Sequence, residues 1–494
     1  MNPNPNNSKQ AGTFAISAGR EVYGELCLAG PQSSLYLRDR EFINGNALPD
    51  AIVGVLHDLT RVTLVNCVTT QTTGTTVRGS EGYHSAKVFP HFVLQGTQHL
   101  NPAERNVDAI RFVIRDATSV FHDFDAFGHV IRPESVIDQV VKANNLPRHV
   151  RTGRHAEILY FTGHTEIFSA KTAIGIVSAN HNPILSTFGD PSGVALNNTI
   201  QVSISFDGPI AFNDAIHRLM IIRGFLGMLI GREQGVLSTS ISIHGATGSD
   251  QRLNVYWSLA PGRDLAEDDE KPHPTDVLVD PIRYPDAFPL ILASWVGRHN
   301  ERRDARARFF DLFAKRRYDV DALIGLANVF DILPATAAPE DIPLSPELEE
   351  AKRESVERFR CLPKSPERDS VLGALGRLGK PALKHKIRHR ANQLAAATKR
   401  FPDLELVTDE AVNCRNHYVH GSPGSIAYFE FPTLMFFFTD TLEFVFAASD
   451  LIDAGWDINA WMDMGTVMSH RFGRYRVGYD ANLQLLRTAL RNGA

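Results

Sequence analysis

The sequence is organised around the stretch Cys414-Arg415-Asn416-His417-Tyr418-Val419-His420-Gly421, which places an arginine, an asparagine and two histidines within eight residues. The preceding run Thr408-Asp409-Glu410 supplies a capping residue and acids suited to the first turn of a helix. The glycine at position 421, with Pro423 two residues later, is typical of a helix end. We therefore expect one helix over 409–420 that carries its polar side chains near its C-terminus.

Asn416 and His420 are four positions apart, so they share one face of that helix. The long side chain of Arg415 can swing to the same side, and the helix dipole favours the imidazolium form of His420. An acid–base histidine beside a fixed cation suits cleavage of the RNA backbone, because the RNA itself supplies the nucleophile and no metal is needed. The alternative is an exposed helix end with a polar tip, since chance yields roughly one or two such arginine–histidine spacings in this chain.

The composition indicates a globular chain with more than one domain. Its 494 residues exceed what one hydrophobic core organises, and its 43% hydrophobic and 22% charged residues are ordinary. The net charge of -5 means that a nucleic-acid site must be a local patch. The four cysteines form no CxxC pair. Residues 1–11 read as a polar tail without a signal-peptide pattern. The apolar runs are too short to cross a bilayer. We expect a soluble cytoplasmic protein without a membrane partner.

Two kinds of secondary structure divide the chain into an α+β multidomain protein. Residues 12–262 predict a β-rich, sandwich-like domain, with a barrel as the alternative, and one helix over 211–232 packed on the sheet. A linker is expected over 263–282, where proline, glycine and the acidic run 264–270 disfavour packing. Residues 283–494 predict an all-α bundle with helices at 288–318, 320–333, 346–359, 370–378, 383–401, 409–420, 431–454 and 458–468.

A basic segment, Arg377–Arg400, precedes the motif helix and contains no acidic residue. Within it Lys384 and Arg388 share a helical face, and we expect them to bind RNA phosphates; the alternative is a solvated helix face. Asp331, on an earlier helix, is either a carboxylate that orients a motif side chain or a surface acid. The run from His122 to His129 has residue types that bind metals but no partner cluster, so no metal and no cofactor are expected.

The pattern Arg415-Asn416-x-x-x-His420-Gly421 resembles the RNxxxHG signature of HEPN ribonucleases, whose core is a bundle of four to five helices. The match is most similar to the ApeA-like HEPN proteins of bacterial anti-phage defence. Residues 309–334 resemble the early helices of that subfamily, and the β-rich half resembles the ApeA N-terminal domain. The middle of the motif departs from the family, because His417-Tyr418-Val419 stands where small, basic or aliphatic residues are usual.

The resemblance implies a homodimer or higher homo-oligomer in which two RxxxxH helices form one composite site. It implies metal-free cleavage of cellular RNA, often transfer RNA, that leaves a 2′,3′-cyclic phosphate and halts growth after an unknown phage-derived trigger. His420 would be the general acid and base, Arg415 the cation on the phosphate, and Asn416 the positioning residue. His417 is either a second proton carrier or a structural residue on the helix surface.

Two functions from different classes are consistent with these patterns. The first is an endoribonuclease whose β-rich domain senses infection and holds the nuclease inactive until then. The second is a ligand- or protein-binding module whose helical half is a catalytically silent dimerisation scaffold. The presence of Arg415, Asn416 and His420 together favours the enzyme, because a silent scaffold has no need of all three.

Overall fold

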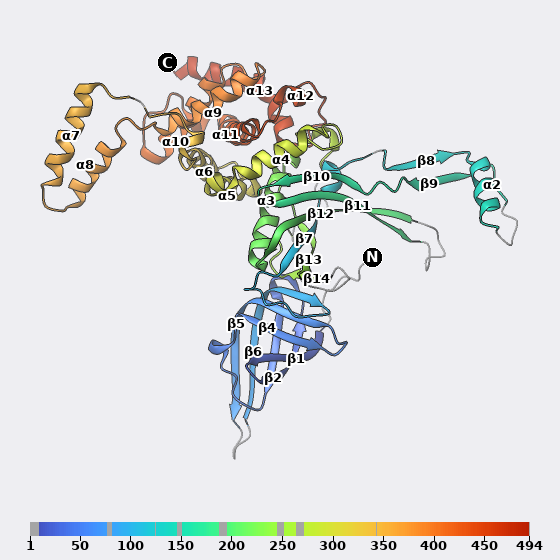
Figure 1. The fold of residues 1–494 in the computed structure, drawn as a ribbon. Helices are drawn as coiled ribbons and strands as arrows, with labels where there is room; N and C mark the ends of the chain where they lie inside the picture. Colours follow the sequence, from blue (N-terminus) through green and yellow to red (C-terminus); the bar gives the residue numbers. More distant parts are fainter. Residues whose placement is uncertain are drawn as a thin grey trace. The chain divides into compact units, whose positions relative to one another are not determined.

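The computed structural model describes residues 9–76, 82–123, 125–145, 151–186, 195–244, 251–262, 271–341 and 343–493 (Figure 1). The chain divides into two compact units, one formed by Met1–Ile230 with Gln234–Val296 and one by Gly231–Glu233 with Gly297–Ala494. The first is rich in strands and the second is helical, which confirms the predicted fold class. The acidic run 264–270 of the expected linker and residues 1–8 of the expected tail lie outside the described residues. Residues 9–11, also expected in the tail, begin the first strand.

Six antiparallel strands of the first unit close into a barrel, drawn in blue in Figure 1. The ring follows the order β6-β3-β2-β1-β4-β5 and closes where β5 pairs with β6. Its core contains Phe14, Leu35, Leu64 and Val88, and a side chain at Gly54 would collide with the ring of Phe14. These strands are β1 (Lys9–Ser17), β2 (Arg20–Cys27), β3 (Ser34–Asp39), β4 (Ala51–Leu56), β5 (Arg61–Thr76) and β6 (Gly82–Gly96).

The same sheet continues beyond the barrel because β6 changes its partner along its length. Residues 84–88 of β6 pair with β3, whereas residues 92–95 pair with β14. From β14 (Arg252–Trp257) the order runs through β13 (Val236–Ile243), β7 (Val107–Ile114), β12 (Ala195–Ile210), β11 (Gly175–Ser186) and β10 (Glu166–Thr172). The strands thus form a barrel with a sheet extension. The barrel was the alternative to the sandwich-like form expected for this half.

One long helix packs on this extension, as predicted. Helix α3 (Phe212–Ile230) contacts β7 and β12 and buries Leu219, Phe225 and Leu229. Three further elements were not expected: α1 (Ala117–Val120), α2 (Glu134–Ala143) and β8 (Phe127–Ile131). Strand β8 pairs with β9 (Glu157–Phe161), where the sequence does predict a strand over 158–161. None of the residues of α2 is buried in the structure.

The expected helix over 288–318 is wrong, since the chain breaks it at Arg298 into two helices. Helix α4 (Ala287–Gly297) groups with the β-rich unit, because Phe288 and Trp295 pack on Phe225 of α3. Helix α5 (His299–Lys315) begins the helical unit and ends at Arg316, which has a left-handed backbone with φ of 45°.

Helix α11 (Pro432–Asp453) forms the centre of the second unit. It contacts α6 (Val320–Asp331), α9 (Leu383–Ala397), α10 (Leu404–His420) and α13 (Arg471–Gly493). The 22-residue α11 is buried along most of its length. Helix α13 was not predicted, because arginines and glycines interrupt the pattern of its apolar residues. The residues that it buries include Phe472, Tyr475 and Tyr479. The remaining helices are α7 (Pro346–Arg360), α8 (Pro366–Arg377) and α12 (Ile458–Met462).

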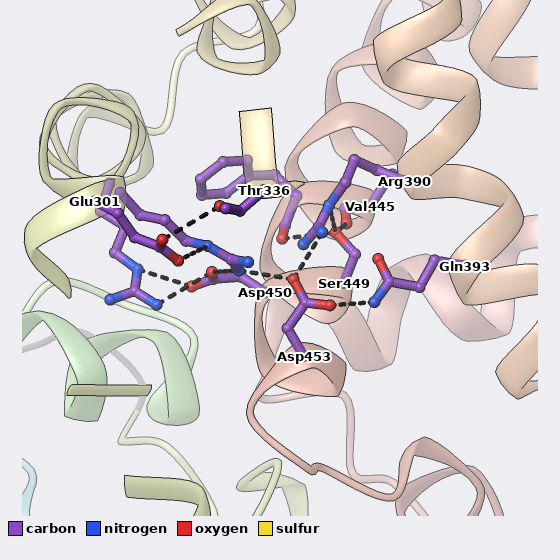
Figure 2. Close-up of polar contacts among 11 residues, drawn as sticks. Glu301, Thr336, Arg390, Gln393, Val445, Ser449, Asp450 and Asp453 are labelled. Carbon is purple, nitrogen blue, oxygen red and sulfur yellow. Dashed lines mark hydrogen bonds and ion pairs between the residues drawn. The ribbon is translucent and has the colours of Figure 1, made fainter. Parts of the chain in front are cut away.

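A buried charge network joins α5, α9 and α11 (Figure 2). Arg302 Nη1 lies 2.7 Å from Asp450 Oδ1 and 2.7 Å from Asp453 Oδ2, and Arg306 Nε lies 3.0 Å from Asp450 Oδ2. Arg390 Nη1 lies 2.7 Å from Asp453 Oδ2. Burial opposes ionisation of Asp450, but the two guanidinium groups outweigh it and hold its pKa below the usual value. The network fixes the three helices against each other, including the helix that precedes α10.

Candidate active site at the end of α10

Helix α10 begins five residues before the predicted start, at Leu404 instead of Asp409. The expected cap Thr408 is buried inside the helix, and its hydroxyl donates to the carbonyl of Glu405. The predicted C-terminal end is confirmed, because Gly421 adopts a φ of 66° and its N–H bonds the carbonyl of His417 at 3.0 Å. The helix packs on α6, α9 and α11, so a rigid frame holds the motif residues in its last turns.

The structure brings the three predicted catalytic residues together. Arg415 Nη1 donates to Asn416 Oδ1 at 3.0 Å and lies 3.1 Å from His420 Nε2. Because a guanidinium only donates, Nε2 is the acceptor in this contact.

A fourth residue, Asn328 of α6, completes the group and was missed in the sequence. Its Oδ1 accepts from Arg415 Nη2 at 3.1 Å. The nearby Asp331, considered as an orienting acid, instead pairs with Lys386 of α9 at 3.2 Å and is a surface acid. In the sequence, Asn328 is marked only by its amide within the apolar run of α6. Many helices contain such an isolated polar residue, so this feature does not indicate a site.

The site lies on an exposed surface. Arg415 and Asn416 are half-buried, whereas His420 is exposed together with Tyr418 and Val419. Arg415 Nε is buried and has no hydrogen-bond partner among the described residues, so the N–H of this nitrogen is unused. Phe429 is 79% exposed and follows Tyr428, whose ring lies 6.4 Å from that of Tyr418. An open site with an apolar rim can admit a polymer or a second protein chain.

His417 is engaged elsewhere. Its Nδ1 donates to the carbonyl of Ser422 at 2.9 Å, and its ring contacts those of Tyr418 and Tyr428 at 5.1 and 5.5 Å. These contacts tie the end of α10 to the segment that follows. The neighbouring Cys414 is also no reactive group, because burial raises the pKa of its thiol to about 12.

The predicted RNA-binding residues Lys384 and Arg388 lie on α9, and neither contacts the Arg415–His420 group within the described ranges. Arg388 makes a two-pronged ion pair with Asp409 of α10 and lies 3.1 Å from Glu405. Lys384 Nζ lies 3.4 Å from the same Asp409 carboxylate. The two cations therefore connect α9 with α10 and have their charges matched by acids.

The described residues contain neither a metal-binding cluster nor a membrane-spanning helix. Across the part of the chain that the structure describes, His, Cys, Asp and Glu side chains nowhere gather in a group of three or more that could hold a metal. The run from His122 to His129 forms no such group, and its Phe124 lies outside the described residues. Among the helices of the described ranges, none has the length and apolar character needed to cross a bilayer.

Comparison with protein families gives two matches that cover most of the chain. The model for ApeA N-terminal domain 1 matches residues 4–295, and the model for the Apea-like HEPN domain matches residues 324–459. The second match includes Asn328 and the whole Arg415–His420 group. The chain is a HEPN protein, and it belongs to the ApeA-type HEPN family, which confirms the resemblance read from the motif. No curated protein and no solved structure matches it.

Proposed function

We propose that this protein is a metal-independent endoribonuclease of bacterial anti-phage defence that cleaves cellular RNA after infection. The observation that carries the proposal is the contact of Arg415 with His420 at the exposed end of a rigidly held helix. A guanidinium and an imidazole at 3.1 Å provide a phosphate-binding cation and a proton carrier within reach of one phosphodiester. The family's place in defence supports the biological role.

His420 and Arg415 divide the chemistry between them. An incoming phosphate attracts Arg415 Nη1 and releases His420 Nε2, which then takes the proton of the 2′-hydroxyl. The 2′-oxygen attacks phosphorus and the bond to the 5′-oxygen breaks, which leaves a 2′,3′-cyclic phosphate and a 5′-hydroxyl. Asn416 and Asn328 hold the guanidinium in position through their side-chain oxygens. Arg415 stabilises the charge that builds on the phosphate oxygens.

The leaving 5′-oxygen needs a proton from a second acid, and His417 is bound to Ser422. We therefore propose that a second copy of the chain supplies it, so that two α10 helices form one composite site in a homodimer. The exposed side chains of Tyr418, Val419 and Phe429 beside His420 offer an apolar surface for this contact.

RNA binding by Lys384 and Arg388 is a further part of the proposal. Because Asp409 already pairs with both, RNA phosphates must compete with that carboxylate. Exchanging both residues for glutamate is expected to weaken RNA binding and to flatten its salt dependence. Unchanged cleavage and an unchanged salt slope would assign the pair to the α9–α10 connection alone.

The cellular setting completes the proposal. The nuclease acts in the cytoplasm on RNA, with transfer RNA as the preferred candidate, and the β-rich unit restrains it until a phage-derived trigger binds. The limits expected from the sequence were 12–262 for the sensor, 263–282 for the linker and 283–494 for the nuclease; because α4 groups with the strand-rich unit, we propose that the nuclease begins at Gly297 instead.

The test is expression of the full chain in infected cells, followed by sequencing of RNA ends. Wild type is expected to produce fragments with cyclic phosphate ends and to stop growth, whereas His420→Ala is expected to do neither. His385→Ala removes an exposed imidazole from α9 and serves as the matched control, which should behave as wild type. Equal RNA profiles for wild type and His420→Ala would favour the silent scaffold instead.

A further inference from the structure

The helical unit contains a cavity of about 330 Å³ whose lining is unusually rich in arginine. Four arginines and one glutamate line it. The apolar side of the lining comes from Leu312, Ala322 and Leu326. The charged residues are Arg316, Arg317, Glu443, Arg471 and Arg474, and Tyr318 lies among them.

Two of the arginines are available to a ligand in different ways. Arg317 is exposed and makes no ion pair or hydrogen bond within the described part of the chain. Arg474 uses Nη1 for the carbonyl of Met468 at 3.1 Å, and its other guanidinium nitrogens make no contact in the described residues. Guanidinium groups that converge on one space and outnumber the acids of its lining are suited to phosphate oxygens.

The base of the cavity is rigid. Arg471 Nη1 pairs with Glu443 at 2.6 Å, and its guanidinium stacks on the ring of Phe313 at 3.8 Å. The hydroxyl of Tyr318 donates to Asp440 at 2.9 Å. Burial, with the nearby carboxylate of Glu443, raises the pKa of Asp440 to about 6. One fixed arginine and a fixed tyrosine thus provide a preformed wall, as small-molecule sites commonly have.

We propose that this cavity binds a small polyphosphate ligand of the nucleoside triphosphate class. Several phosphates match the excess of arginines, while the apolar side and Tyr318 accommodate a ring. A volume near 330 Å³ falls in the usual range for small-molecule pockets, whereas single-stranded RNA requires an extended groove. A small ligand is therefore favoured over the RNA substrate as the occupant.

The cavity shares helix α6 with the site on α10. Ala322 and Leu326 line the cavity, and Asn328, two positions further along, binds Arg415. Residues two positions apart do not share a helix face, so α6 separates the cavity from the motif residues. A regulatory role for the ligand rests on the proposed nuclease function, but its binding does not.

Binding is best tested by titration calorimetry on the full chain carrying His420→Ala, so that the result does not depend on nuclease activity. ATP without metal and pyrophosphate are expected to bind saturably, inorganic phosphate more weakly, and adenosine not measurably. Arg317→Glu and Arg474→Glu are each expected to weaken ATP binding at least tenfold at an unchanged melting temperature. Arg303→Glu, which changes an exposed arginine of α5 outside the cavity, is the matched control.

Two results would overturn the proposal. One is the lack of saturable ATP and pyrophosphate binding at millimolar concentration. The other is equal ATP affinity in the Arg317→Glu variant and the Arg303→Glu control. A third result would assign the arginines to RNA binding instead. In that case an RNA oligonucleotide would bind the protein but not Arg317→Glu, and ATP would not displace it. Loss of cleavage in His420→Ala with no ATP binding would retain the nuclease and reject the ligand site.

Discussion

Removal of the Asp450 carboxylate is expected to destabilise the helical unit severely. Asp450 is 2% exposed and pairs with Arg302 and Arg306, whose side chains are 3% and 1% exposed. In Asp450→Ala, Arg306 loses its anion while it stays enclosed, whereas Arg302 retains Asp453 at 2.7 Å. Breaking a buried ion pair on one side typically costs about 3 to 5 kcal/mol, because a buried charge is left without a counter-charge.

This loss is large enough to measure by calorimetry of the full chain. For a unit of this size each kcal/mol shifts the melting temperature by roughly 2 to 4 °C, so Asp450→Ala should lower it by roughly 6 to 20 °C. Asp463→Ala is the control, since Asp463 pairs with Arg400 at 3.2 Å on the surface, with side chains 72% and 61% exposed. That exposed pair should contribute about 1 kcal/mol at most.

A second variant separates charge from packing. Adding Arg306→Met to Asp450→Ala removes the enclosed cation that has lost the Asp450 carboxylate from its Nε and Nη2, and should restore part of the lost stability. The reasoning would be refuted if Asp450→Ala shifted the melting temperature no more than Asp463→Ala, or if the added Arg306→Met lowered it further.

Three further results are expected. The pKa of Asp440 is about 6 in the folded protein and 3.8 in the unfolded chain. As the pH rises, the unfolded chain therefore releases this proton first, which favours unfolding. Wild type should lose up to ~3 kcal/mol of stability between about pH 4 and pH 6. Asp440→Asn keeps an acceptor for Tyr318, so thermal melts should show it more stable than wild type above pH 6 and equal to it below pH 4; an advantage independent of pH would contradict this. Asn328→Ala should lower RNA cleavage at least tenfold with little change in melting temperature, because Arg415 loses one anchor; full activity would show that the anchor is dispensable. His417→Ala should retain cleavage and lose about 1 kcal/mol of stability in denaturant titrations, whereas lost cleavage at full stability would identify it as a proton carrier.

The sequence predicted those structural features that depend on residues close together in the chain. The end of α10 at Gly421, the shared side of Asn416 and His420, and α3 on its sheet all depend on residues close together in the chain. The start of α10 was misplaced because Thr408 and Asp409 have the side chains of a cap but lie within the helix. Asp409 instead binds cations of α9, which no pattern within α10 indicates.

The features that were missed depend on contacts between distant residues. Barrel closure requires β5 to pair with β6, while β6 turns to β14 over its second half, and neither register is encoded in a single strand. Asn328 lies 87 positions from Arg415, so only the packing of α6 on α10 makes it part of the site. Helix α4 resembles a member of the bundle, but its aromatic contacts with α3 place it in the other unit.

The position of α6 between the cavity and the α10 site allows binding at one site to affect binding at the other. Leu326 faces the arginine-lined cavity and Asn328 holds Arg415, so a displacement of this one helix alters both places together. If a bound polyphosphate changes the affinity of the α10 site for RNA by some factor, RNA must change the affinity of the cavity for the polyphosphate by the same factor. Under the proposed nuclease function and with such a coupling, accumulating RNA fragments would change how firmly each copy of the protein retains its ligand, so that the enzyme would respond to its own product.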